Sequence, residues 1–119
     1  MAEDFVVLYV EDDPQVRETF VDLLASKGFH IIPAQDAHAA LRFLGEQRVD
    51  VLFTDIVMPG FNGIELAKQA KRLQPNLKVI FVTGHAVRAH EAARLGKLFI
   101  KPLRAQQIEA ELRELMSSH

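Results

Sequence analysis

Four short stretches of this sequence carry polar side chains that could act together chemically. Residues 11–13 are Glu-Asp-Asp and directly follow an apolar run, while Asp55, Thr83 and Lys101 each stand at the end of another apolar run. Adjacent carboxylates repel one another unless a cation lies among them. A hard divalent cation prefers oxygen ligands, and Mg²⁺ typically takes one or two carboxylates and keeps several waters. The acidic run therefore predicts a Mg²⁺ site.

The remaining reactive residues predict phosphoryl chemistry beside this metal. A carboxylate can attack phosphorus as a nucleophile, while a hydroxyl and an ammonium bind the other phosphoryl oxygens. Asp55 is the expected nucleophile because it stands alone ahead of a loop rich in turn formers. Thr83 and Lys101 are then the expected phosphoryl-binding groups, and Glu11 and Asp12 the expected metal ligands.

Strand-length apolar runs alternate with helical patterns along the chain, and the reactive residues follow the strands. The expected strands are residues 5–10, 30–34, 51–54, 78–83 and 98–100, and the expected helices are residues 14–27, 36–46, 63–73, 87–94 and 105–116. Because parallel strands need crossover connections, this alternation predicts a doubly wound α/β fold, a five-stranded parallel sheet with helices on both faces. Asp13 before Pro14 predicts a helix N-cap, and Pro33 predicts an edge strand. The carboxyl ends of the strands then form the functional crevice.

The composition narrows the class of protein. The chain has 119 residues, 49% hydrophobic and 25% charged, which fits a single domain. Its formal net charge is −2 and its basic residues are scattered, so direct binding to nucleic acid or an anionic membrane is not expected. It has no cysteine, which excludes disulfides and thiolate chemistry. An acidic start and the lack of an apolar run of about 20 residues predict a cytoplasmic location.

The sequence resembles the receiver domain of two-component response regulators, over essentially the whole chain. The matching motifs are YVEDDP, FTDIVMPGFNGIEL, VIFVTGHA and FIKPL, in this order. The resemblance implies one receiver domain over residues 1–119, with the flavodoxin-like strand order 2-1-3-4-5. It also implies a histidine kinase or a histidine phosphotransfer protein as the phosphoryl donor, and slow hydrolysis of the phosphorylated domain.

The resemblance also implies a role for each matching residue. Asp55 would be phosphorylated, and Thr83 and Lys101 would contact the phosphoryl group. Asp12 would be a direct Mg²⁺ ligand and Glu11 would act largely through water. The backbone carbonyl of residue 57, a valine, would be a further ligand, which gives Glu11, Asp12, Asp55 and Val57 as the metal site. The bond between Lys101 and Pro102 would be cis.

Two alternatives remain open at this point. The first is a metal-dependent phosphohydrolase with an aspartyl intermediate, which is disfavoured because no second acid forms a DxD arrangement with Asp55. The second is a degenerate receiver that only binds a partner, which is disfavoured because the acceptor residues are all present. A zinc site at His85 and His90 and a nucleotide site both lack the required motifs. The downstream target is not predicted.

Three positions depart from the family or could tune the reaction. Receivers often carry Tyr or Phe three residues before the lysine, but this chain has Leu98 there and Phe99 next to it. Only 17 residues separate Thr83 from Lys101, which predicts a short or irregular fourth helix. His85, two residues after Thr83, is expected at the rim of the phosphoryl pocket, together with Val57.

Overall fold

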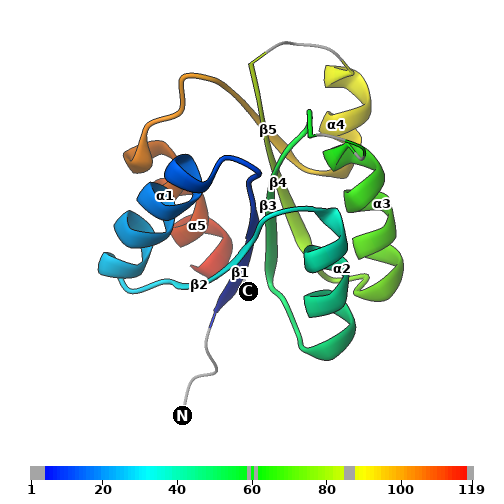
Figure 1. Ribbon diagram of the computed structural model, residues 1–119, viewed down its shortest axis with the longest axis horizontal. Coiled ribbons are helices and arrows are strands. Elements are labelled where there is room, and N and C mark those ends of the chain that lie inside the picture. The colour runs from blue at the N-terminus through cyan, green and yellow to red at the C-terminus, as the bar shows by residue number, and fades with distance from the viewer. Residues whose placement is uncertain (1–4, 59, 61, 85–87, 118–119) are drawn as a thin grey trace.

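The computed structural model describes residues 5–58, 60, 62–84 and 88–117 as five strands that alternate with five helices (Figure 1). The strands are β1 (Val6–Val10), β2 (His30–Ala34), β3 (Val51–Asp55), β4 (Lys78–Thr83) and β5 (Lys97–Ile100). The helices are α1 (Pro14–Ser26), α2 (Ala37–Glu46), α3 (Gly63–Leu73), α4 (Ala89–Leu95) and α5 (Ala105–Ser117). All strand pairs are parallel, and the order is β2-β1-β3-β4-β5. The predicted fold class and strand order are therefore confirmed.

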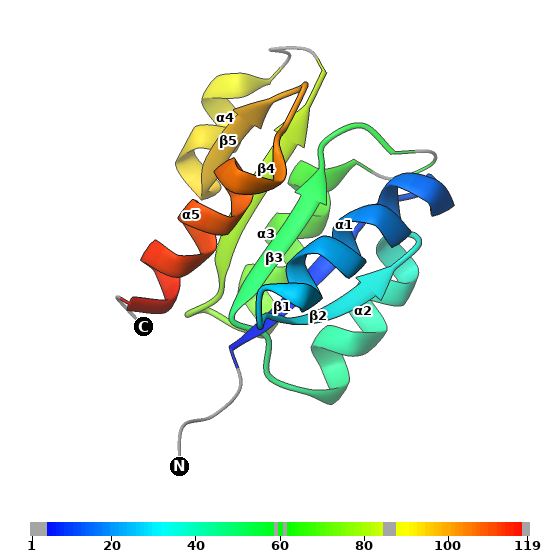
Figure 2. The same cartoon turned by 90° about the vertical axis from the view of Figure 1, so that its left-hand side faces the viewer.

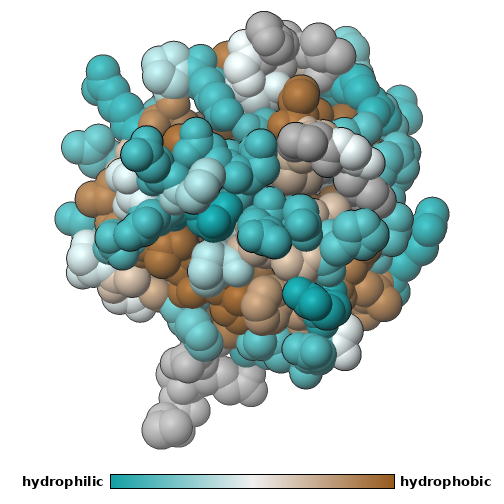
Figure 3. Space-filling model, in the orientation of Figure 1, coloured by the Kyte–Doolittle hydropathy of each residue, from teal (hydrophilic) through white to brown (hydrophobic). Residues whose placement is uncertain are grey.

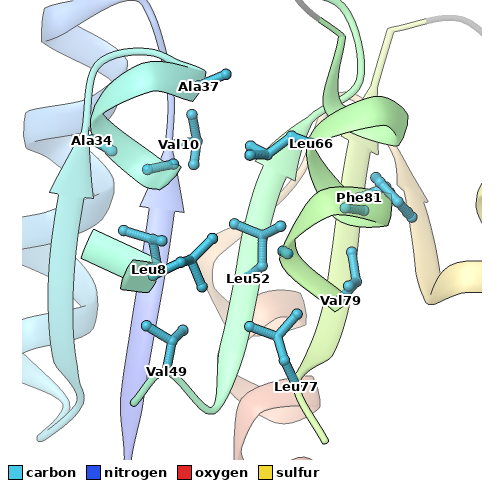
Figure 4. Packing of buried hydrophobic residues seen from close by; sticks show 14 of the residues in the cluster. Leu8, Val10, Ala34, Ala37, Val49, Leu52, Leu66, Leu77, Val79 and Phe81 are labelled. Carbon is cyan, nitrogen blue, oxygen red and sulfur yellow. The ribbon is translucent and has the colours of Figure 1, made fainter. Parts of the chain in front are cut away.

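The sheet lies between two helical layers, with α1 and α5 on one face and α2, α3 and α4 on the other (Figures 1 and 2). Side chains alternate along each strand, so Val7 and Tyr9 pack towards α1 and α5, while Leu8 and Val10 pack towards the opposite layer. Figure 4 shows part of the second cluster, in which strand residues meet buried residues of α2 and α3. Because both faces are covered, the central strands are apolar throughout.

The first helix begins where the sequence predicted. The Asp13 carboxylate accepts hydrogen bonds from the backbone N–H groups of residues 15 and 16, at 2.9 and 3.2 Å, and Pro14 occupies the first helical position. Asp13 is thus a helix cap, and its carboxylate is engaged with the helix rather than with its acidic neighbours.

The apolar side chains of α1 are covered less completely than their helical spacing suggested. Leu24 is buried, whereas Val16 and Leu23 are 38% and 41% exposed. In Figure 3, hydrophilic residues surround smaller hydrophobic patches on the face shown. Spacing places residues on one side of a helix, but it does not say whether the neighbouring layer reaches all of them.

The edges of the sheet and the fourth helix also follow the sequence closely. β2 pairs only with β1, which confirms the edge position predicted from Pro33. α4 is short, as the spacing between the last two motifs predicted, although its expected start at Val87 lies outside the described residues. It turns directly into β5 at Gly96, where a Cβ atom would lie 2.1 Å from the Val79 carbonyl oxygen. No helix in the described part of the chain is both long and apolar enough to cross a membrane.

Candidate functional site

The carboxyl ends of β1, β3, β4 and β5 bring the predicted reactive residues together. Asp55 is the last residue of β3 and is 8% exposed, and Thr83 ends β4 and is 1% exposed. Glu11 directly follows β1 and Lys101 directly follows β5. The strand order makes β1 and β4 the two neighbours of β3, so these side chains border the Asp55 carboxylate.

Asp55 and Lys101 form the central contact of the site. The Lys101 ammonium donates to Asp55 Oδ2 at 2.7 Å, and the Val57 backbone N–H donates to Asp55 Oδ1 at 3.2 Å. The Lys101 backbone N–H also donates to the Thr83 carbonyl oxygen at 2.8 Å, which fixes the lysine relative to β4. The bond between Lys101 and Pro102 is cis. The predicted nucleophile therefore faces a cation across a charge-assisted hydrogen bond.

Glu11 and Asp12 add negative charge beside this pair. Glu11 is buried, with Oε2 accepting the Asp13 backbone N–H at 3.1 Å, while Asp12 is exposed. Burial raises the pKa of Glu11; the hydrogen bond from the Asp13 backbone opposes this, and the side chain of Asp12 and the charge of Asp55 raise it further. The acidic side chains thus interact with one another across the site.

The same charges act on the lysine. Burial alone would lower the pKa of Lys101, but its hydrogen bond with Asp55 and the charges of Asp55, Glu11 and Asp12 raise it above its ordinary value. Lys101 therefore remains a cation throughout the neutral range and offsets part of the carboxylate charge.

The loop after β3 is held tightly against the acceptor strand. The Gly63 backbone N–H donates to the Ile56 carbonyl oxygen at 2.7 Å, and a Cβ atom on Gly63 would lie 2.1 Å from the Asp55 carbonyl oxygen. Val57 is 62% exposed and Met58 is buried. Only glycine leaves room for α3 to begin so close to the backbone of Asp55.

The donor set suits a hard cation. In the described ranges, no three acidic or histidine side chains already form a complete metal-binding cluster. Mg²⁺ does not need one, because it binds through one or two carboxylates and retains water. The interacting charges of Glu11, Asp12 and Asp55, offset only in part by Lys101, are all oxygen donors of the kind it prefers. The residues present therefore fit Mg²⁺.

Sequence reasoning missed one residue that supports this site. Arg17 lies on α1, and its Nη1 donates to the Glu11 carbonyl oxygen at 2.7 Å. The contact ties the acidic loop to the helix that follows it. Arg17 comes one turn after the N-cap, so the helix start alone could have suggested that its side chain reaches back to the loop. His85, the expected rim residue, lies outside the described residues.

A buried carboxylate at the end of a central parallel strand, paired with a lysine and bordered by two further acids, defines the phospho-acceptor class of doubly wound α/β proteins. Residues 7–113 match the response regulator receiver domain family. The chain belongs to this family, the phospho-acceptor module of two-component signalling. The match gives no support to the phosphohydrolase or to the degenerate receiver.

Individual relatives agree with this assignment. The chain is 34% identical to the response regulator receiver protein CpdR of Brucella abortus over 92% of this chain and 95% of CpdR. It is 32% identical to the sensor kinase CckA of the same organism, over 92% of this chain but only 12% of CckA. The structure of the response regulator protein TrrA from Thermotoga maritima, in complex with Mg²⁺-BeF, superposes with a TM-score of 0.84 at 23% identity, covering 93% of this chain and 98% of TrrA.

Proposed function

We propose that this receiver is phosphorylated on Asp55, with a phosphohistidine of a histidine kinase or phosphotransfer protein as the donor. The observation that carries the proposal is the 2.7 Å contact between the Lys101 ammonium and Asp55 Oδ2 at the buried end of β3. Lys101 holds the carboxylate in one orientation and supplies a positive charge where phosphoryl oxygens would gather. Thr83, fixed at the end of the neighbouring strand, presents its hydroxyl on the same side.

The transfer needs no proton at the carboxylate. An Asp55 oxygen forms a bond to phosphorus as the bond from phosphorus to the histidine nitrogen breaks, and the imidazole leaves with the electron pair. Glu11, Asp12, Asp55 and the Val57 carbonyl oxygen would hold Mg²⁺, whose charge offsets the negative charge of the transferring group. Lys101 neutralises a second side of that group, and the resulting acyl phosphate is later hydrolysed.

The partner class follows from the relatives. CckA is a sensor kinase, and the segment that resembles this chain forms a small part of it. A receiver within a kinase works beside a phosphohistidine, so a donor of the same chemistry is expected for this chain. A cytoplasmic location remains a prediction.

The test is mapping of the modified residue after labelling with acetyl phosphate and Mg²⁺. The wild-type protein and an Asp13→Asn variant should be labelled on Asp55, because asparagine still caps a helix. Asp55→Asn should not be labelled, because an amide is not a nucleophile. Normal labelling of Asp55→Asn, or a label on another residue, would show that the acceptor is wrongly assigned.

A further inference from the structure

A cavity of about 520 Å³ lies next to the acceptor site, between α1 and the segment that follows β5. Val16 and Phe20 of α1 line one side, Leu103 lines the other, and Tyr9 and Phe53 of the sheet form the floor. Its volume falls within the roughly 300–1,000 Å³ of small-molecule sites. The phosphoryl transfer itself requires no apolar space of this kind.

The cavity has a rigid aromatic wall. The rings of Tyr9 and Phe53 are stacked, with centroids 4.6 Å apart and planes at 20°. Phe20 lies 5.9 Å from the Tyr9 ring and 6.3 Å from the Phe53 ring. Tyr9 and Phe53 are buried in the sheet, so they keep this arrangement whether or not the space is filled. Such a wall favours the apolar body of a ligand.

The same cavity carries one cation and one acid. Lys101 lines it, its side chain is 44% exposed, and its contact with Asp55 uses one of the three N–H donors of an ammonium. Glu11 also lines it, but its Oε2 is engaged by the Asp13 backbone N–H. The lysine therefore has donors left for a second anionic group.

We propose that this cavity binds a small amphiphilic anion, a carboxylate or acyl phosphate whose apolar chain packs on Tyr9, Phe20 and Phe53 and whose charged end meets Lys101. The aromatic wall and the lysine select for opposite ends of one molecule. The inference rests on the proposed function only in that Lys101 also serves the acceptor, so an occupant either competes with phosphorylation or supplies it.

The two sources of this ligand differ in their chemistry. A free carboxylate can only occupy the site and engage Lys101. An acyl phosphate can also donate, because an Asp55 oxygen bonds to phosphorus while the bond from phosphorus to the acyl oxygen breaks. The carboxylate then leaves with the electron pair, and no proton or further reactant is required.

Binding can be followed on Tyr9, because it is the single tyrosine of a sequence without tryptophan. Hexanoate should change its emission at concentrations about tenfold or more below those needed for acetate, because its longer chain buries more apolar surface. Hexylamine should not, since its cationic end meets Lys101. Val16→Glu should weaken hexanoate binding by placing a like charge in the cavity. Leu23→Glu, at an equally exposed α1 position that does not line it, should not.

The source is decided by comparing labelling with hexanoyl phosphate and acetyl phosphate. Several-fold faster labelling by hexanoyl phosphate, lost in Val16→Glu, identifies a donor; equal rates together with inhibition by hexanoate identify a free carboxylate. Hexanoate binding no tighter than acetate, or equal losses in Val16→Glu and Leu23→Glu, would overturn the proposal. Absence of labelling by both donors, with hexanoate still bound, would instead count against Asp55 as the acceptor.

Discussion

Asp12 and Asp13 are neighbours in the chain, but their surroundings differ. The Asp13 carboxylate is engaged with the first turn of α1, whereas Asp12 interacts with Glu11 at the acceptor site. We expect Asp12→Asn to weaken Mg²⁺ binding by about tenfold or more. Asp13→Asn should change it little, because asparagine is an equally good cap. Calorimetric titration of both variants with Mg²⁺ checks this, and equal losses would contradict the assignment of Asp13 as a cap.

Lys101 places a positive charge where a metal would also act. We expect Lys101→Ala to bind Mg²⁺ as tightly as the wild type or more tightly, because a competing cation beside Asp55 is removed. The same variant should respond poorly to phosphorylation. Lys97→Ala, at the opposite end of β5, is the matched control and should change neither property. Weaker Mg²⁺ binding in Lys101→Ala alone would mean that the lysine organises the metal site.

At the scale of elements, the junction of β3 and α3 tolerates no side chain. A Cβ at Gly63 would lie 2.1 Å from the Asp55 carbonyl oxygen, so Gly63→Ala should displace the acceptor strand and lower both stability and the rate of phosphorylation. Gly45, inside α2, faces open space. Gly45→Ala should therefore stabilise the protein by about 0.5–1 kcal/mol. Thermal unfolding and labelling rates of the two variants provide the measurement, and a harmless Gly63→Ala would refute the close approach.

The alternation of β5 bears on its departure from the family. Leu98 packs with the cluster that faces α2, α3 and α4, whereas Phe99 packs with the cluster that faces α1 and α5. The ring of Phe99 therefore lies on the other side of the sheet and cannot replace a ring at position 98. That the usual aromatic switch is altered in this chain stays a prediction.

Sequence patterns were sufficient for the elements and for the convergence of the site. Apolar runs located all five strands, and the rule that parallel strands end at one edge placed Glu11, Asp55 and Lys101 together before any coordinates. Patterns could not show which partner each side chain takes. The reach of Arg17 back to the Glu11 carbonyl and the aromatic wall around Tyr9 depend on packing between elements, which periodicity does not encode.

At the scale of the whole molecule, stability and chemistry are located at opposite ends of the sheet. Asp50 precedes β3; its Oδ2 accepts the Val6 backbone N–H at 2.8 Å, and Oδ1 accepts from Arg48. Asp50→Ala should lower the free energy of unfolding by about 1–3 kcal/mol, because a buried N–H loses its partner. Asp22→Ala, on the exposed face of α1, should cost little.

Phosphorylation provides the contrast for Asp50. Below its unfolding temperature, the Asp50→Ala variant should be labelled on Asp55 at close to the wild-type rate, because the change lies at the far end of β3 from the acceptor. Chemical denaturation and labelling of the same preparations give both quantities. A large fall in the labelling rate of the folded variant would show that the two ends of the sheet are coupled.

Pro33 has a consequence for how these molecules meet one another. The Ala34 carbonyl oxygen accepts from the Glu11 N–H, so the backbone groups of residue 34 face β1 and those of residue 33 face outward. A proline there removes a donor from the open edge of β2, which a strand of another molecule would need for continuous pairing. Pro33→Thr should therefore keep the fold but increase self-association on storage, as measured by light scattering; unchanged scattering would mean that other features protect this edge. One residue on an edge strand thus keeps concentrated copies of the chain from joining their sheets.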